Sequence, residues 1–269
     1  MKLWNRCSFR GAVVLHFLAI DTVCAVLAWS LLADRLLGSA IHPLSLLWTG
    51  AGVWLAYTAD RWMDSLPGST EQNPGERHRF AGRNRNSIAL AWLCVWILSL
   101  GSAVAILPAG ILLGGAVVAI LGIAYLLIIQ RLPSRDETGK LRAGGGWVVG
   151  LLVATAANLF PALEGNASAI TKLIVWLLTA WAFFLQTRAT RLWEEGESIP
   201  RQWLLILTIC GAIAATILHE APAAVAALTL AGGILITDRL PIHDKVAVAD
   251  WVLAIAGVCG WAVALALLP

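Results

Sequence analysis

Long apolar stretches, separated by short polar segments, repeat along the whole chain. Most are about 20 residues long, which is the length that an α-helix needs to cross the hydrocarbon core of a bilayer. The nine stretches cover residues 12–37, 43–66, 87–106, 109–130, 144–163, 170–193, 202–219, 222–237 and 248–268. The pattern predicts an all-α polytopic membrane protein with nine transmembrane helices, organised as one domain over residues 1–269.

The composition agrees with a membrane protein. Of the 269 residues, 59% are hydrophobic and only 13% are charged, and the mean hydropathy is +0.78. A soluble domain of this length carries about 25% charged residues. The five cysteines are scattered singly, so neither a disulfide framework nor a zinc site is indicated. With a net charge of only +3, we expect the lipid bilayer as a partner and no nucleic acid.

Lysine and arginine predict the orientation in the membrane. With a cytoplasmic N-terminus and nine crossings, all but two of the 19 basic residues fall on the cytoplasmic side, and the exceptions are Arg35 and Lys172. The linkers on the other side, such as residues 107–110 and 219–222, are too short to hold a site. We expect an integral protein of a bacterial inner membrane, with a cytoplasmic active site and the C-terminus outside.

An acidic motif ends the second apolar stretch. Asp60 and Asp64 stand four residues apart with Arg61 between them, and on a helix this spacing places both carboxylates on one face. Such like charges repel, and oxygen donors are the ligands that Mg²⁺ prefers, so the pair predicts a bound magnesium ion. The alternative is a solvated helix end. Basic residues that follow, among them Arg77 and Arg79, favour the metal because arginines beside metal-holding carboxylates suit a phosphorylated substrate.

These residues resemble the UbiA superfamily of intramembrane prenyltransferases, whose first motif is N-D-x-x-D-R-x-x-D. Here D-R-x-x-D is intact at residues 60–64, while Ala56 and Tyr57 replace the leading N-D. Residues 124–150, with a tyrosine, a basic loop, a lysine and a glycine-containing helix, are also similar to the family. The family's aspartate-rich second motif is replaced by residues 186–197. The resemblance implies a nine-helix bundle that binds a prenyl diphosphate through Mg²⁺ and ionises it inside the membrane.

The replacement segment has a regular spacing. Gln186, Thr190 and Glu194 lie at i, i+4 and i+8, on one helical face. The spacing resembles the (N/D)-x-x-x-(S/T)-x-x-x-E metal motif of class I terpene synthases, with glutamine in the first place. An amide oxygen, a hydroxyl and a carboxylate are plausible ligands of a hard cation, and Glu195 could add another oxygen. The alternative is a polar helix end that faces water.

The motifs and the resemblance together assign expected roles. The catalytic residues would be Asp60, Asp64, Glu194 and Tyr57. The diphosphate would be bound by Arg61, Arg77, Arg79, Lys140, Arg142, Arg188 and Arg191, which would neutralise the leaving pyrophosphate. Mg²⁺ would be held by Asp60, Asp64, Gln186, Thr190, Glu194 and Glu195. Some of the 14 tryptophans could stabilise the allylic cation with their ring faces.

Two further ionisable residues, His16 and Asp21, lie inside the first apolar stretch. Ionisable groups are expensive in a membrane, so these two either face a cavity or pair with neighbouring helices. The length of this stretch and its polar residues favour a retained first helix over a signal peptide.

Three function classes remain open. The first is a terpene synthase of UbiA type in isoprenoid biosynthesis, which cyclises geranyl, farnesyl or geranylgeranyl diphosphate. The second is a prenyltransferase that moves the prenyl group to a lipophilic aromatic acceptor. The third is a non-catalytic relative that binds polyprenyl lipids. The altered second motif and the absence of an evident acceptor-binding group favour the first class.

Overall fold

The protein is a bundle of antiparallel helices in the computed structural model, which describes residues 15–64, 80, 82–129, 144–194, 196–218, 221–239 and 242–267. Within these ranges there are nine long helices and no strand, which confirms the predicted all-α class. The helices are α2 (Ile20–Leu36), α3 (Pro43–Asp64), α5 (Arg85–Ile106), α6 (Ala109–Ile129), α7 (Gly144–Glu164), α8 (Ala169–Glu194), α9 (Arg201–Leu218), α10 (Ala221–Thr237) and α11 (Ile242–Leu267).

Five of these helices are long and apolar enough to cross a membrane, namely α5, α6, α7, α8 and α11. No residue of α5 is buried in the protein, and large apolar side chains such as Leu98 and Leu113 are 71% and 68% exposed. Apolar surface on this scale is stable only against lipid or another protein. The chain is therefore a helical membrane protein.

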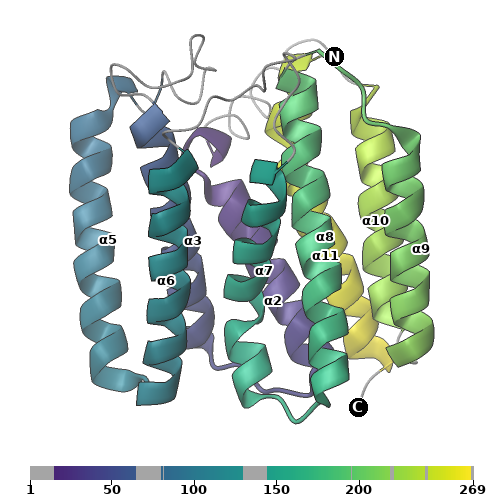
Figure 1. Cartoon of the computed structure of the whole chain (residues 1–269), viewed down its shortest axis with the longest axis horizontal. Coiled ribbons are helices and arrows are strands. Elements are labelled where there is room, and N and C mark those ends of the chain that lie inside the picture. Colours follow the sequence, from purple (N-terminus) through teal and green to yellow (C-terminus); the bar gives the residue numbers. More distant parts are fainter. Residues whose placement is uncertain are drawn as a thin grey trace.

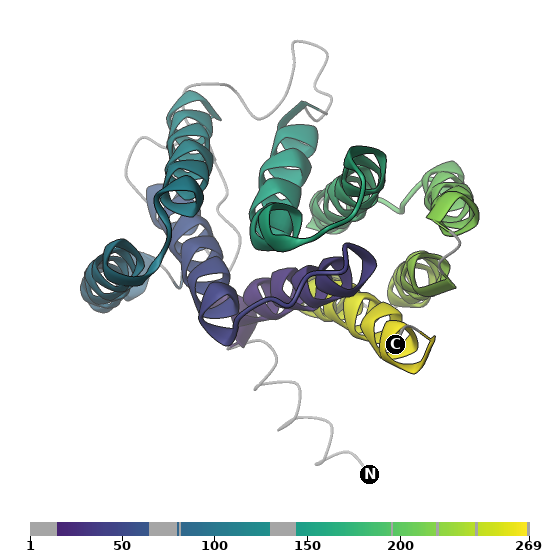
Figure 2. The ribbon, with the colours of Figure 1, turned by 90° about the horizontal axis from the view of Figure 1, so that it is seen from below.

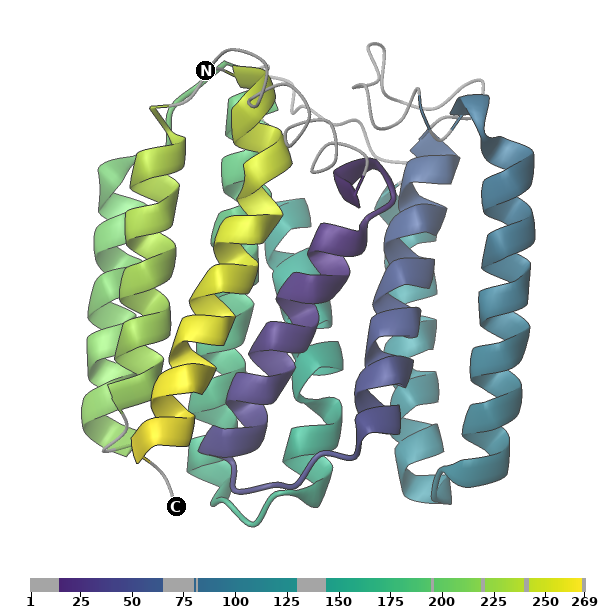
Figure 3. The same cartoon turned by 180° about the vertical axis from the view of Figure 1, so that it is seen from behind.

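Successive helices run in opposite directions, so alternate helix ends gather at each end of the bundle (Figures 1 and 3). One end holds the starts of α2 and α11 and the ends of α3 and α8. Seen along the bundle, the first and last of the long helices, α2 and α11, lie side by side (Figure 2). The Trp29 indole N–H on α2 donates a hydrogen bond of 3.0 Å to the Leu253 carbonyl on α11.

Small residues allow the helices to approach closely. A Cβ atom at Gly257 of α11 would lie 2.9 Å from the Ala28 Cβ of α2, and one at Gly150 of α7 would lie 2.7 Å from the Ala180 carbonyl oxygen of α8. Both contacts are closer than side chains tolerate, so these crossings depend on glycine. Close packing at small residues is the usual basis of helix association in membranes.

Two helix boundaries differ from the sequence prediction by more than two residues. The first apolar stretch is not one helix: a short helical segment at residues 15–17 is followed by a turn at Ala19, whose φ of 58° is left-handed, and α2 begins only at Ile20. The last helix begins at Ile242, six residues before the predicted start at 248. The polar residues before 248 belong to the first turns of α11. One of them, Lys245, forms an ion pair there, with its Nζ 3.5 Å from the Asp238 Oδ1.

Candidate functional site

Six polar side chains are buried together where the segment 15–17, α2, α8 and α11 meet. None of the six is more than 8% exposed. This group, below called the polar centre, consists of His16, Asp21, Thr22, Gln186, Thr190 and Asp250. In a bundle of membrane helices, such a concentration of buried polar groups marks a site rather than ordinary packing.

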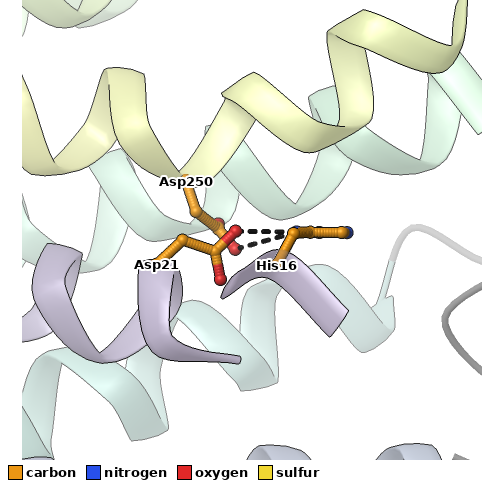
Figure 4. Close-up of side chains that lie close together, drawn as sticks. All are labelled: His16, Asp21 and Asp250. Carbon is orange, nitrogen blue, oxygen red and sulfur yellow. Dashed lines mark hydrogen bonds and ion pairs between the residues drawn. The ribbon is translucent and has the colours of Figure 1, made fainter. Parts of the chain in front are cut away.

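The left-handed turn at Ala19 folds His16 back onto the start of α2. The His16 Nδ1 lies 2.7 Å from the Asp21 Oδ2, and the backbone N–H of Thr22 donates to the other oxygen, Oδ1, at 2.9 Å. Figure 4 shows the imidazole with its Nδ1 edge turned to two carboxylates, those of Asp21 and Asp250. The Nδ1 to Asp250 Oδ2 distance is 4.0 Å.

Asp250 of α11 connects α2 with α8. Its Oδ2 accepts a 2.6 Å hydrogen bond from the Thr22 hydroxyl, and its Oδ1 accepts one from the Gln186 amide nitrogen. The same amide nitrogen lies 3.3 Å from the Thr190 hydroxyl. Gln186 and Thr190 therefore share one helical face, as their spacing predicts, and this face is packed against α11 rather than open to water.

The acidic motif of α3 is attached to the polar centre through Arg61. This side chain is only 4% exposed, and its Nη1 donates to the backbone carbonyls of His16 and Phe17. The Tyr57 hydroxyl, one turn earlier on α3, lies within electrostatic reach of Asp60, Arg61 and Asp250. The D-R-x-x-D segment and the polar centre thus adjoin one another at one end of the bundle.

The other residues expected at the site are placed as follows. Asp60 is half-buried on α3, and Asp64 and Glu194 are the last residues of α3 and α8, with side chains outside the described part. Arg191 is half-buried in the last turn of α8. The expected site residues that lie outside the described residues altogether are Arg77, Arg79, Lys140, Arg142 and Glu195.

Arg188 does not lie in the polar centre. A two-residue step along a helix turns a side chain to a different face, and Arg188 stands two residues after Gln186. Its guanidinium carbon lies 5.6 Å from the ring centroid of Trp203 on α9, beside a group of stacked aromatic rings that includes Phe184 and Trp147. Its Nε and Nη1 are buried without a hydrogen-bond partner among the described residues.

Sequence analysis missed Asp250. A single carboxylate inside the apolar stretch 248–268 is the signal that could have identified it, because a charge in a membrane span needs a partner. For His16 and Asp21 the sequence left two alternatives open, a position facing a cavity or pairing with neighbouring helices. The structure pairs them with each other and places both beside Asp250 on α11.

The polar centre could in principle hold a metal ion. His16 Nδ1 and one oxygen each from Asp21 and Asp250 lie within 4.8 Å of one another. However, all four carboxylate oxygens accept hydrogen bonds, from His16, from Thr22 and from Gln186. A metal-ligating histidine also normally donates its second ring N–H to a partner, and His16 Nε2 has none in the described part of the chain. The arrangement is that of a hydrogen-bonded network holding an oriented imidazole.

The Thr22 hydroxyl should contribute measurably to stability. Thr22→Val keeps the side-chain shape but leaves the buried Asp250 carboxylate without the 2.6 Å hydrogen bond, so we expect a loss of about 1–3 kcal/mol. The matched control is Thr49→Val, because the Thr49 hydroxyl is also buried but bonds only to the Ser45 carbonyl of its own helix. Thermal unfolding of both variants in detergent should separate them. Equal melting temperatures would contradict a structural role for this bond.

Comparisons of the chain with protein-family models, with curated proteins and with solved structures gave no match. The functional assignment therefore depends on the geometry and the chemistry of the residues themselves.

Proposed function

We propose that the protein is a Mg²⁺-dependent intramembrane enzyme that ionises a prenyl diphosphate and cyclises the resulting cation to a terpene. The observation that carries the proposal is the contact between the acidic motif of α3 and a buried polar centre at one end of a membrane bundle. Ionisable groups are costly inside a membrane bundle, so their presence beside the D-R-x-x-D motif indicates a function. Such groups could stabilise the charge that develops when a lipophilic diphosphate ionises.

The proposal includes a topology. All nine long helices would cross the bilayer as a UbiA-like bundle, with the N-terminus and the polar centre on the cytoplasmic side. Five helices meet the length and hydropathy needed, while α2 and α10 are only 17 residues long. The distribution of lysine and arginine supports the orientation.

Asp60 and Asp64 fit a magnesium ion best. Their four-residue spacing at the end of α3 predicts that they would supply hard carboxylate oxygens from one face of the helix, where a charged headgroup could arrive from the water. Gln186 and Thr190 fit less well, because their side chains are held inside the polar centre by hydrogen bonds to one another and, from Gln186, to Asp250. Glu194, at the end of α8, would supply a third carboxylate, from a second helix. When bound, Mg²⁺ would neutralise charge on the diphosphate as the C–O bond breaks.

The cationic side chains would stabilise the departing pyrophosphate. In this proposal the group contains Arg77, Arg79, Lys140, Arg142 and Arg191. Arg188 would act only from the neighbouring face of α8, where its buried nitrogens lack partners among the described residues. Arg61 would instead position the site, because its Nη1 donates hydrogen bonds to the backbone of the segment 15–17.

An acceptor-free assay tests the proposal. Purified protein in lipid nanodiscs would receive geranyl, farnesyl or geranylgeranyl diphosphate with Mg²⁺ and nothing else. A cyclase should release pyrophosphate and an extractable hydrocarbon or terpene alcohol, because the cation can react only with its own double bonds, lose a proton or capture water. Strict dependence on an added aromatic acceptor would indicate the prenyltransferase instead. Binding of the diphosphate without turnover in either assay would indicate a non-catalytic relative.

Glu194 gives a second, local prediction. Glu194→Gln should lower Mg²⁺-dependent pyrophosphate release by about 100-fold or more if its carboxylate is a metal ligand. Glu197→Gln is the matched control, because Glu197 is exposed just beyond the same helix end and should be tolerated. Similar activity of the two variants would show that the end of α8 is simply solvated.

A further inference from the structure

We propose that His16 is the base that ends the reaction, and that its Nε2 accepts the proton released when the carbocation is converted to a neutral hydrocarbon. The inference rests on the proposed ionisation of a prenyl diphosphate and adds a residue that the acidic motif does not contain. Three features support it: the orientation of the imidazole, the lack of a partner for Nε2 among the described residues, and the position of His16 beside α3.

The two carboxylates fix which ring nitrogen carries the proton. A carboxylate only accepts hydrogen bonds, and Asp21 Oδ2 lies 2.7 Å from His16 Nδ1, with Asp250 Oδ2 at 4.0 Å. With the Asp21 carboxylate ionised, the proton of this hydrogen bond lies on Nδ1. In the neutral imidazole the lone pair then lies on Nε2, at the far edge of the ring, which points away from both carboxylates (Figure 4). An aspartate that holds the Nδ1 proton is the established way to orient a histidine base.

The Nε2 atom of His16 is buried. The residue is 4% exposed, and no described residue forms a hydrogen bond with Nε2. Burying a polar atom without a partner costs free energy, and a catalytic role is one explanation for such an atom. A C–H group of the substrate carbocation, next to the cationic carbon, would donate its proton to this Nε2 atom.

His16 is also held where a substrate cation would form. Arg61, inside the D-R-x-x-D motif, bonds to the backbone carbonyls of His16 and Phe17, so the diphosphate site and the imidazole are fixed to one another. The Phe17 ring lies next to His16 and pairs with Phe80 at a centroid distance of 5.3 Å. Aromatic faces at this position are suited to a positively charged hydrocarbon.

The chemical step is a simple deprotonation. The C–H bond next to the cationic carbon breaks, and its electron pair forms the new C=C bond. The proton goes to His16 Nε2, and the imidazolium is stabilised by the Asp21 carboxylate at Nδ1. The proton then passes to the released pyrophosphate or to water. The overall change is prenyl diphosphate to hydrocarbon, pyrophosphate and one proton, with no oxidant or reductant.

The variant His16→Asn separates this role from a structural one. An asparagine amide can still donate to Asp21 from the position of Nδ1, but it has no group in the place of Nε2. We expect hydrocarbon formation to fall by about 100-fold or more relative to pyrophosphate release, with the cation trapped by water as an alcohol. His42→Asn is the matched control, because His42 is exposed at the other end of the bundle and should leave the product unchanged.

The outcomes are distinct. Absence of pyrophosphate release from the wild-type protein would refute the proposed function itself. Normal release with an unchanged hydrocarbon in His16→Asn would refute only the role of His16. If that variant fails to fold, ¹⁵N NMR of histidine-labelled wild-type protein at neutral pH still tests the geometry. We expect a protonated Nδ1 and a bare Nε2, and a proton on Nε2 or a bound metal ion on the ring would overturn the inference.

Discussion

Asp60→Asn and Asp64→Asn should each abolish Mg²⁺-dependent release of pyrophosphate while the helical bundle remains folded. Each change removes one negative charge from a pair that shares a face of α3 and would hold the ion between them. Loss of a group that stabilises developing charge typically lowers the rate by about 100- to 1,000-fold. Steady-state pyrophosphate release in nanodiscs, measured over a range of Mg²⁺ concentrations, would quantify the loss.

The control for this experiment is Glu197→Gln, which removes a carboxylate from the same end of the bundle at an exposed position. Size-exclusion profiles of all three variants should match wild type, since neither aspartate substitution changes the volume of the side chain. Wild-type rates in both aspartate variants would remove the metal site from the proposal.

Gly150→Ala should strongly destabilise the protein, although alanine is the better helix former. The added Cβ would lie 2.7 Å from the Ala180 carbonyl oxygen and 3.0 Å from the Phe184 amide nitrogen, and backbone atoms cannot rotate away. We expect α7 and α8 to separate at a cost of about 3 kcal/mol. The melting temperature, followed by size-exclusion chromatography of heated samples, should fall clearly.

The matched substitution Gly115→Ala in α6 should stabilise the protein instead of destabilising it. Nothing lies within 4 Å of a Cβ built there, so Gly115→Ala should gain up to about 1 kcal/mol from helix propensity. If both variants behaved alike, the close approach of α7 and α8 would not be a determinant of stability.

Much of the fold could be predicted because each helix leaves a local signal. The predicted starts at residues 43, 109 and 144 coincide with those of α3, α6 and α7. The turn at Ala19 could not be predicted, since alanine gives no sign of a left-handed conformation. It forms because the contacts of His16 with Asp21 and Arg61 stabilise it.

The site was only partly predictable for a related reason. The spacing of Gln186 and Thr190 predicts a shared face, and the two side chains do lie in hydrogen-bonding distance of one another. Asp250 has no comparable local pattern. Its partners Gln186 and Thr22 stand 64 and 228 residues away along the chain, so that only the folded bundle brings them together.

The pairing of α2 with α11 has a consequence for biosynthesis. Thr22 is synthesised early, whereas its hydrogen-bond partner Asp250 is synthesised 228 residues later. At translation rates of about 5–20 residues per second, Asp250 is synthesised roughly ten to fifty seconds after Thr22. During this interval Asp21 can already pair with His16 and with the Thr22 backbone N–H, whereas the Thr22 hydroxyl lacks its Asp250 partner. A polypeptide released before α11 is complete would never form that link between α2 and α11.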